Sequence, residues 1–327
     1  MRFVLAVMFG MLAFVGAAHA TVVSLEFDDG TSDQRQAVPL LDAHGYKATF
    51  FVEGGRVGQT GHMSWGQLEA LQADGQEVTG HTLTHPHLTQ VSTDTARTQV
   101  CDDRTRLLSH GLLANDFAYP YGDHNSTVEQ IVADCGYSSG RIVSGIDSIV
   151  ACHGCPLTET IPPKDPYATR TPDSVRETTT LDQLKTLVGR GGWIQLVMHH
   201  ICDACDTYSV SKATLSALLD YLATQPSVTV KTVAQVMDPN TPYARVTTPA
   251  DGAQASGTVT ITAGTSGAVR RVRFFADGKQ LGTRTAAPWR WKWNTSTVAS
   301  GDHTLRVLVE AAGGNAGLSP ETTVTLP

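Results

Sequence analysis

The chain has 327 residues, and domains of roughly 100–200 residues leave room for two of them. Hydrophobic residues make up 41% and charged residues 17% of the sequence, a globular composition that excludes collagen, a coiled coil and disorder throughout. The formal net charge of −7 argues against a strongly basic nucleic-acid-binding protein. The one long apolar stretch lies at the N-terminus, so no membrane span is expected after it.

Residues 1–20 have the pattern of a secretory signal peptide. Arg2 supplies the positive charge, Phe3 to Val15 the apolar run, and Ala18-His19-Ala20 a small-x-small cleavage site. A membrane anchor is the alternative, although the run is shorter than the roughly 20 residues of a span. We expect cleavage near Ala20 and a secreted protein, either extracellular or periplasmic.

The cysteines agree with export. There are six, none in the predicted signal: Cys101, Cys135, Cys152, Cys155, Cys202 and Cys205. An even number in an exported protein indicates disulfides, with 15 pairings among which the sequence does not choose. A zinc site built from the two Cys-x-x-Cys pairs is an alternative, although the 46 residues between them exceed the usual spacing. Free thiols are a third.

Strands and helices alternate from residue 21 to about residue 240. Strands are expected at 22–27, 48–52, 77–79, 116–119, 141–143, 193–198 and 228–230. Helices are expected before Gly45 and at 64–75, 92–110, 127–135, 181–189 and 211–224, the second with a Ser64–Gln67 capping box. Residues 144–180 are expected to be irregular. This alternation predicts a parallel sheet, either open or closed into a barrel.

The pattern changes at Asp238-Pro-Asn-Thr-Pro242, where prolines and small polar residues indicate a linker. Only short alternating runs follow, at 258–263, 269–276, 289–293 and 303–309, with an Asp277-Gly278 hairpin turn. They predict a β-sandwich of immunoglobulin type. We therefore place a catalytic domain at 21–238, a linker at 239–244 and the sandwich at 245–327. Residues 243–327 carry a net charge of +4, against −12 for residues 21–242.

Polar clusters follow several predicted strands. In Asp28-Asp29-Gly30, adjacent carboxylates of an extended segment point to opposite sides, so one can bind a cation while the other acts as a base. His81 and His85 follow the third strand, and neutral imidazole is a good zinc ligand. Pro86 disfavours helix at His85, so we expect a loop or a single turn there, with His87 as a rival ligand.

Two more clusters end the fourth and sixth strands. Phe117-Ala-Tyr-Pro-Tyr-Gly122 predicts a loop whose backbone N–H groups could face a ligand, and Leu196-Val-Met-His-His200 offers a general acid. Each of the four clusters has a plainer reading, as a turn, exposed histidines, a strand end or a buried histidine. Together, however, they fall at the carboxyl ends of parallel strands, where α/β barrels build active sites. Two His and one Asp make the open three-ligand zinc site of a hydrolase.

In order and spacing, these four clusters resemble the motifs of the polysaccharide deacetylases of carbohydrate esterase family four, over residues 21–238. The resemblance implies a distorted (β/α) barrel. It also implies metal-dependent removal of acetyl groups from N-acetylglucosamine polymers or acetylated xylan. By this resemblance Asp28 would be the general base, and Asp29, His81 and His85 would bind the metal.

The same resemblance assigns roles to the remaining candidate site residues. The backbone N–H of Tyr121, next to Pro120, would bind the oxyanion and substrate. His199 would be the general acid, with His200 as the fallback and a further substrate contact.

Two departures from the family pattern stand out. Ala118 occupies the position where the family usually has an Arg that pairs with the base. The family's Asp that tunes the catalytic His has no clear match, and the candidates are Asp147, Asp165, Asp173, Asp203 and Asp206. The 202–206 loop is expected to form one wall of the cleft.

The C-terminal part resembles bacterial immunoglobulin-like domains that follow secreted enzymes. Trp289, Trp291 and Trp293 would share one strand face, with Arg290 and Lys292 opposite. These Trp rings could stack on sugars, or at least two of them could fill the sandwich core. The positive charge of this part could favour contact with anionic cell-wall polymer.

The sequence thus predicts a secreted metal-dependent polysaccharide deacetylase. It would hydrolyse N-acetyl or O-acetyl groups of a glycan such as chitin, peptidoglycan or acetylxylan and release acetate. Zn²⁺ is the expected metal, although Co²⁺, Ni²⁺ or Mn²⁺ suit the same ligands. The alternatives are a non-catalytic carbohydrate-binding protein on the same scaffold and a metal-dependent hydrolase of other C–N bonds. No nucleic-acid partner is expected.

Overall fold

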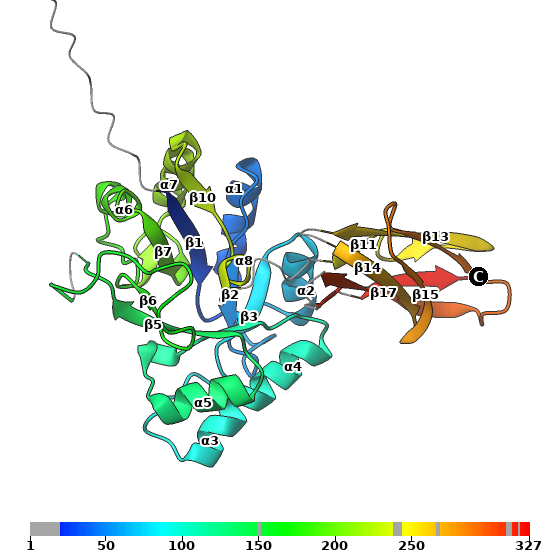
Figure 1. The fold of residues 1–327 in the computed structure, drawn as a ribbon, viewed down its shortest axis with the longest axis horizontal. Coiled ribbons are helices and arrows are strands. Elements are labelled where there is room, and N and C mark those ends of the chain that lie inside the picture. The colour runs from blue at the N-terminus through cyan, green and yellow to red at the C-terminus, as the bar shows by residue number, and fades with distance from the viewer. Residues whose placement is uncertain (1–19, 149–151, 238–243, 266–268, 312–315, 320) are drawn as a thin grey trace, which may run out of the picture.

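The computed structural model describes residues 20–148, 152–237, 244–265, 269–311, 316–319 and 321–327. The predicted signal up to His19 and nearly all of the predicted linker lie outside the described residues. The chain forms an α/β unit followed by an all-β unit, which lies beside helix α2 (Trp65–Ala73) (Figure 1).

Eight parallel strands form one curled sheet in the order β10-β1-β2-β3-β4-β5-β6, with β7 also paired to β1. Their bounds are β1 Thr21–Phe27, β2 Thr49–Val52, β3 Glu77–Gly80, β4 Asp116–Ala118, β5 Ser139–Gly145, β6 Thr169–Thr171, β7 Gly192–Met198 and β10 Val228–Val230. Strand β1 is central, because it pairs with β7 from Thr21↔Gly192 to Phe27↔Met198 while β10 and β2 also pair with it. This arrangement confirms the predicted deacetylase-type (β/α) barrel, here as a curled half-barrel.

Helices pack their apolar side chains, such as Leu68, Leu215 and Leu219, into one core with this sheet. They are η1 Ser32–Ala37, α1 Val38–Ala43, α2, α3 Thr93–Arg97, η2 Thr98–Asp102, α4 Asp103–Ser109, η3 Pro120–Gly122, α5 Ser126–Asp134, α6 Leu181–Val188, α7 Lys212–Thr224 and α8 Val233–Met237. The predicted capping box opens α2, since Ser64 and Gln67 each accept the other's backbone N–H. Among the described helices, none has the length and apolar character needed to cross a bilayer.

Three details differ from the sequence prediction. Strand β4 ends at Ala118, one residue early, and β6 lies within the segment that was expected to be irregular. Helix α8 was not predicted, because five residues are too few to display a helical period. The predicted 92–110 helix is present as a continuous run, with η2 as a π-helical turn in its middle.

All six cysteines form disulfides, which confirms that prediction and excludes the zinc and free-thiol alternatives. The pairs are Cys101–Cys135, Cys152–Cys155 and Cys202–Cys205. The first pair joins η2 to the end of α5, and the others each close a four-residue turn.

The C-terminal unit is a sandwich of two sheets, ordered β11-β13-β16 and β12-β19-β17-β14-β15, with β18 paired to β17. The strands are β11 Ala244–Thr248, β12 Ala253–Gln254, β13 Thr258–Thr265, β14 Val269–Ala276, β15 Lys279–Arg284, β16 Arg290–Asn294, β17 Gly301–Ala311, β18 Ala316–Leu318 and β19 Thr322–Leu326. Alternate residues, such as Val272 and Phe274, fill the core between the sheets. The predicted Asp277-Gly278 turn joins β14 to β15, with φ of 48° and 73°.

The three tryptophans of this unit pack against its core. Trp293 is buried, and Trp289 and Trp291 are partly buried against the same cluster. A Cβ atom on Gly282 would lie 2.1 Å from the Trp291 ring, so the glycine makes room for that ring. This packing favours the core alternative over an open sugar-stacking face.

We predict that the Cys101–Cys135 disulfide contributes most to stability. It closes a loop of sequence separation 34, so replacing both residues with Ser should lower the unfolding free energy by roughly 3–4 kcal/mol. The matched Cys202→Ser and Cys205→Ser double variant, with separation 3, should lose only about 2 kcal/mol. Urea denaturation of both variants tests this, and equal losses would contradict it.

Candidate active site

The four predicted clusters meet at one cavity of about 490 Å³ at the carboxyl ends of the strands. Its lining residues include seven predicted site residues, namely Asp28, Asp29, His81, His85, Tyr121, His199 and His200. Pro120 is buried next to Tyr121 at the start of η3. The cavity also includes Asp173, Ser174, Asp206, Tyr208 and Val143.

The backbone around this cavity adopts conformations that are unusual for residues with side chains. Asp29, Thr82, His85 and Tyr121 have φ of 76°, 70°, 61° and 60°. Such left-handed residues cost of order 1–3 kcal/mol each and cluster at functional sites. The turn at Asp29 explains why it diverges from Asp28, a different cause from the strand alternation we expected. His85 lies in a loop, as predicted.

Asp29, His81 and His85 form a candidate metal site. One ligand atom from each lies within 4.8 Å of the others. Asp29 Oδ1 is 3.5 Å from His81 Nε2 and 3.6 Å from His85 Nε2, and the two Nε2 atoms are 3.1 Å apart. Three groups facing one point leave a coordination position free, as in catalytic zinc sites.

The local chemistry fits a cation. His81 Nδ1 donates to the Ala118 carbonyl at 2.7 Å, which leaves the Nε2 lone pair facing Asp29 and His85. Asp29 Oδ1 is buried and has no hydrogen-bond partner among the residues that the structure describes. Burial lowers the pKa of His85 to about 4, so its ring is neutral at pH 7, as a ligand must be.

His87 lies outside this group, although the sequence left it as a rival ligand. Its ring stacks on Tyr121 at 3.9 Å between centroids, and its Nδ1 is 3.8 Å from Asp123. Its ring therefore supports Tyr121 at the cavity rim.

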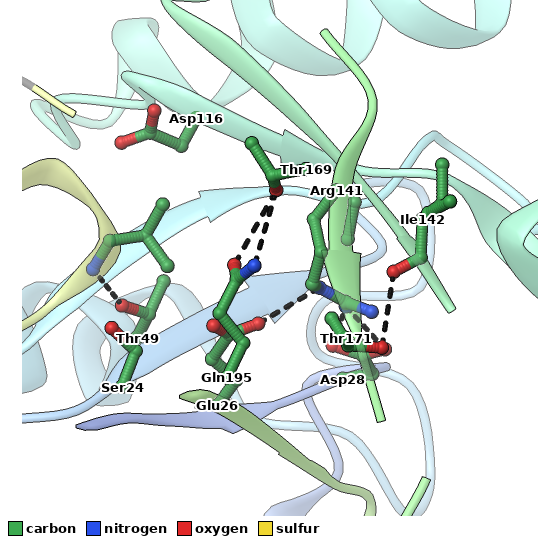
Figure 2. A network of polar contacts seen from close by, with 12 residues as sticks. Ser24, Glu26, Asp28, Thr49, Asp116, Arg141, Ile142, Thr169, Thr171 and Gln195 are labelled. Carbon is green, nitrogen blue, oxygen red and sulfur yellow. Dashed lines mark hydrogen bonds and ion pairs between the residues drawn. The ribbon is translucent and has the colours of Figure 1, made fainter. Parts of the chain in front are cut away.

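Asp28 pairs with a buried arginine that the sequence did not reveal. Arg141, only 1% exposed, places its NH2 nitrogen 2.5 Å and 2.6 Å from the two carboxylate oxygens of Asp28. Its Nε lies 2.9 Å from Glu26 Oε2, so the guanidinium bridges Glu26 in β1 and Asp28 just after that strand (Figure 2). Arg141 on β5 is the register partner of Ala118 on β4. The arginine absent at Ala118 is therefore supplied by the neighbouring strand.

Glu26 competes little for this arginine. Burial raises its pKa to about 8, even though Arg141 acts in the opposite direction, so Glu26 is protonated at pH 7. Arg141 is thus left to pair with Asp28, and both side chains are nearly buried. Removing one partner of such a pair costs roughly 3–5 kcal/mol, because the other charge stays buried.

The two adjacent histidines, His199 and His200, lie in different environments. His199 Nε2 lies 3.9 Å from Asp28 Oδ2, and its ring is 5.2 Å from that of Tyr208. Burial lowers the pKa of His199, so it is neutral at pH 7. His200 instead faces Asp33, with 3.3 Å between its Nδ1 and Oδ2. His199 is therefore the one that faces the proposed base.

None of the five aspartates proposed to tune His199 forms an ion pair with it in the described part of the chain. Asp173 pairs with Arg176 at 3.1 Å, and Asp206 accepts the Tyr208 N–H at 2.8 Å. The His199 Nδ1 atom is buried without a hydrogen-bond partner among the described residues. The 202–206 loop does contribute Asp206 to the cavity wall, as expected.

Sequence reasoning missed three residues of this site: Arg141, Gln34 and Tyr208. Arg141 opened a predicted strand of a parallel sheet, and such strands are usually covered on both faces. A charge there needs a partner, which was the available signal. Gln34 donates to the carbonyls of Asp28 and His199 from helix η1. The Tyr208 ring, 39% exposed, lines the cavity.

Comparison with known proteins agrees with this geometry. Residues 16–140 match the polysaccharide deacetylase family, and residues 242–307 match the bacterial Ig domain family. The chain contains a polysaccharide deacetylase domain and a bacterial immunoglobulin-like domain. Members of the first family are hydrolases that act on acetyl groups. The family resemblance predicted from the motifs is therefore confirmed.

Individual relatives match over part of their length. The peptidoglycan-N-acetylglucosamine deacetylase PgdA of Listeria monocytogenes is 32% identical over 111 residues, 33% of this chain and 23% of its own. The chain spans less than half the length of the curated relatives it matches.

A solved structure shares the fold, and a second is reported beside it for comparison. A Mycobacterium smegmatis protein assigned to the polysaccharide deacetylases superposes with a TM-score of 0.50 at 14% identity, covering 68% of this chain and 90% of its own. A family 4 carbohydrate esterase from Streptomyces lividans gives a TM-score of 0.44 at 21% identity, with coverages of 63% and 88%.

We predict that zinc binding depends on Asp29, His81 and His85. Replacing any one with Ala removes a ligand. The loss of zinc affinity should exceed the 10–100-fold that is typical when a residue hydrogen-bonded to a metal ligand is replaced. His87→Ala removes an imidazole from the same loop without touching the group and should leave affinity unchanged. Isothermal titration with Zn²⁺ measures this, and equal weakening by His87→Ala and His85→Ala would contradict the assignment.

Proposed function

We propose that the protein is a secreted, metal-dependent polysaccharide deacetylase that hydrolyses acetyl groups of a glycan and releases acetate. The observation that carries the proposal is the meeting, at one cavity, of an open Asp-His-His set with an arginine-paired carboxylate and a neutral histidine. These are the parts that hydrolysis of an acetyl amide or ester requires.

The residues divide the reaction between them. Asp29, His81 and His85 would hold Zn²⁺, or Co²⁺, Ni²⁺ or Mn²⁺, which when bound supplies a Lewis acid that polarises the acetyl carbonyl and activates water. Asp28, oriented by Arg141, would take the proton of the attacking water. The backbone N–H of Tyr121 would donate to the developing oxyanion, a contribution worth about 3–4 kcal/mol.

His199 would complete the turnover by protonating the leaving nitrogen or oxygen of the sugar. Its neighbourhood supports this role, because the ring faces Asp28 and adjoins the cavity. A ring that is neutral at pH 7 can pick up the water proton from Asp28 before it delivers one to the sugar.

A glycan suits the rim of the cavity. Tyr121, 59% exposed, lines the cavity beside the proposed metal ligand His85. Tyr208, 39% exposed, lines it beside His199. Exposed aromatic rings beside polar groups are typical of ligand sites, and Pro120, Tyr121 and His200 would contact the substrate. The Listeria relative is named a peptidoglycan-N-acetylglucosamine deacetylase, so N-acetylated peptidoglycan comes first among the candidates, with chitin and acetylxylan next.

The non-catalytic alternative rested on Ala118, which lacks the arginine expected to pair with the base. Arg141 fills that place from β5 and contacts both oxygens of Asp28. The geometry thus removes the feature that favoured a purely carbohydrate-binding protein.

The proposal keeps the predicted chain organisation. A signal peptide at 1–20, a catalytic domain at 21–238, a linker at 239–244 and a sandwich at 245–327 suit an exported enzyme with disulfides. Contact of the sandwich with cell-wall glycan would depend on its positive charge rather than on its tryptophans.

Acetate release from peptidoglycan, chitin oligomers and acetylxylan by the zinc-loaded chain tests the function. We expect release from one of them, loss with chelator and recovery with zinc. Asp28→Asn and His199→Ala should each lower kcat by about 10²–10⁴-fold. His200→Ala removes a proposed substrate contact whose ring pairs with Asp33, so its effect should fall on KM rather than on kcat. A folded, zinc-loaded protein that releases no acetate would contradict the proposal, and an active Asp28→Asn would contradict its base.

A further inference from the structure

One buried side chain touches the backbone of both proposed proton-transfer residues. Gln34, in η1, is 0% exposed. Its Nε2 donates to the backbone carbonyl of Asp28 and, at 2.8 Å, to that of His199. Both acceptors are carbonyl oxygens, so only the NH₂ end of the amide can occupy this place.

This contact lies where the sheet stops holding the two residues together. The β1–β7 ladder ends at Phe27↔Met198, and the last backbone bond runs from Asp28 N–H to the Met198 carbonyl at 2.9 Å. Beyond it the chain turns sharply at Asp29 on one side and enters β8 (His200–Ile201) on the other. The Gln34 side-chain amide therefore links the two chain segments at the point where the next backbone hydrogen bond of the β1–β7 ladder would otherwise do so.

Neighbours of Gln34 in η1 hold the same segment at other points. Asp33 accepts the Ile201 N–H at 2.7 Å and faces His200, and Gln36 Nε2 donates to the Ile201 carbonyl at 3.1 Å. Within η1, only Gln34 bonds to Asp28 and His199 themselves. Gln36 thus makes the same kind of amide-to-carbonyl bond from the same helix, but to Ile201 and not to Asp28 or His199.

We infer that Gln34 is a positioning residue that sets the separation between Asp28 and His199. The inference rests on the proposed function, in which these two side chains move a proton to and from the substrate. Their Cα positions are fixed by the backbone that Gln34 ties together, and misplacement by about 1 Å can cost about 10²-fold in rate. Gln34 is not among the residues that line the cavity, and its printed side-chain bonds go to the carbonyls of Asp28 and His199 rather than to a metal-ligand side chain, so its loss should affect kcat rather than binding.

Kinetics of the zinc-loaded full chain on the glycan that it deacetylates test this. Gln34→Leu removes the donor at similar size, and Gln34→Glu places oxygen against both carbonyls. Each should lower kcat by about 10²-fold while KM and zinc affinity stay within about threefold. The matched Gln36→Leu should retain the wild-type kcat, and thermal unfolding of each variant reports folding. Gln34→Asn, which is too short to reach both carbonyls, replaces Gln34→Leu if that variant does not fold.

The inference is overturned if kcat stays within about threefold of wild type, or if Gln36→Leu loses as much as Gln34→Leu. Absence of acetate release by the wild-type protein would instead contradict the proposed function, and not the inference about Gln34. The NMR titration of His199 then decides about Gln34. An imidazole pKa that moves in Gln34→Leu and not in Gln36→Leu supports the positioning role, and an unmoved pKa overturns it.

Discussion

The buried ion pair between Arg141 and Asp28 is the constraint on which the proposed chemistry depends. Asp28 directly follows the central strand β1, whereas Arg141 lies on β5, four strands further along the curled sheet. The pair therefore crosses the concave interior of the half-barrel, where both side chains are nearly buried and each charge needs the other. The two contacts to Arg141 hold the Asp28 carboxylate away from the metal ligands beside it. The protonated Glu26 leaves this pairing intact.

The rest of the site is arranged around that fixed carboxylate. A left-handed turn at Asp29 directs its carboxylate to the two histidines, so the two adjacent acids face different partners. On the other side, the end of β7 brings His199 to within 3.9 Å of Asp28, while His200 faces Asp33 instead. The proposed metal binding and proton transfer would thus occupy neighbouring parts of one cavity, held by strand ends and strained loops.

Local patterns in the sequence predicted most of this architecture. Periodicity gave the long strands and helices, and the family motifs gave the residues that the cavity brings together. Interactions between distant residues were not predictable: Arg141 and Asp28 are 113 positions apart, and Gln34 and His199 are 165 apart. Short elements such as β6 and α8 carry too few residues for a periodic signal. The tuning aspartate expected from the family has no counterpart beside His199 among the described residues.

Relocating the arginine tests the central claim most directly. Arg141→Ala should reduce kcat for acetate release by at least about 10²-fold, because Asp28 loses the group that orients it. Adding Ala118→Arg places a guanidinium at the register partner on β4, and the double variant should recover part of both kcat and thermal stability. An Arg141→Ala variant that remains folded and as active as wild type would contradict the account.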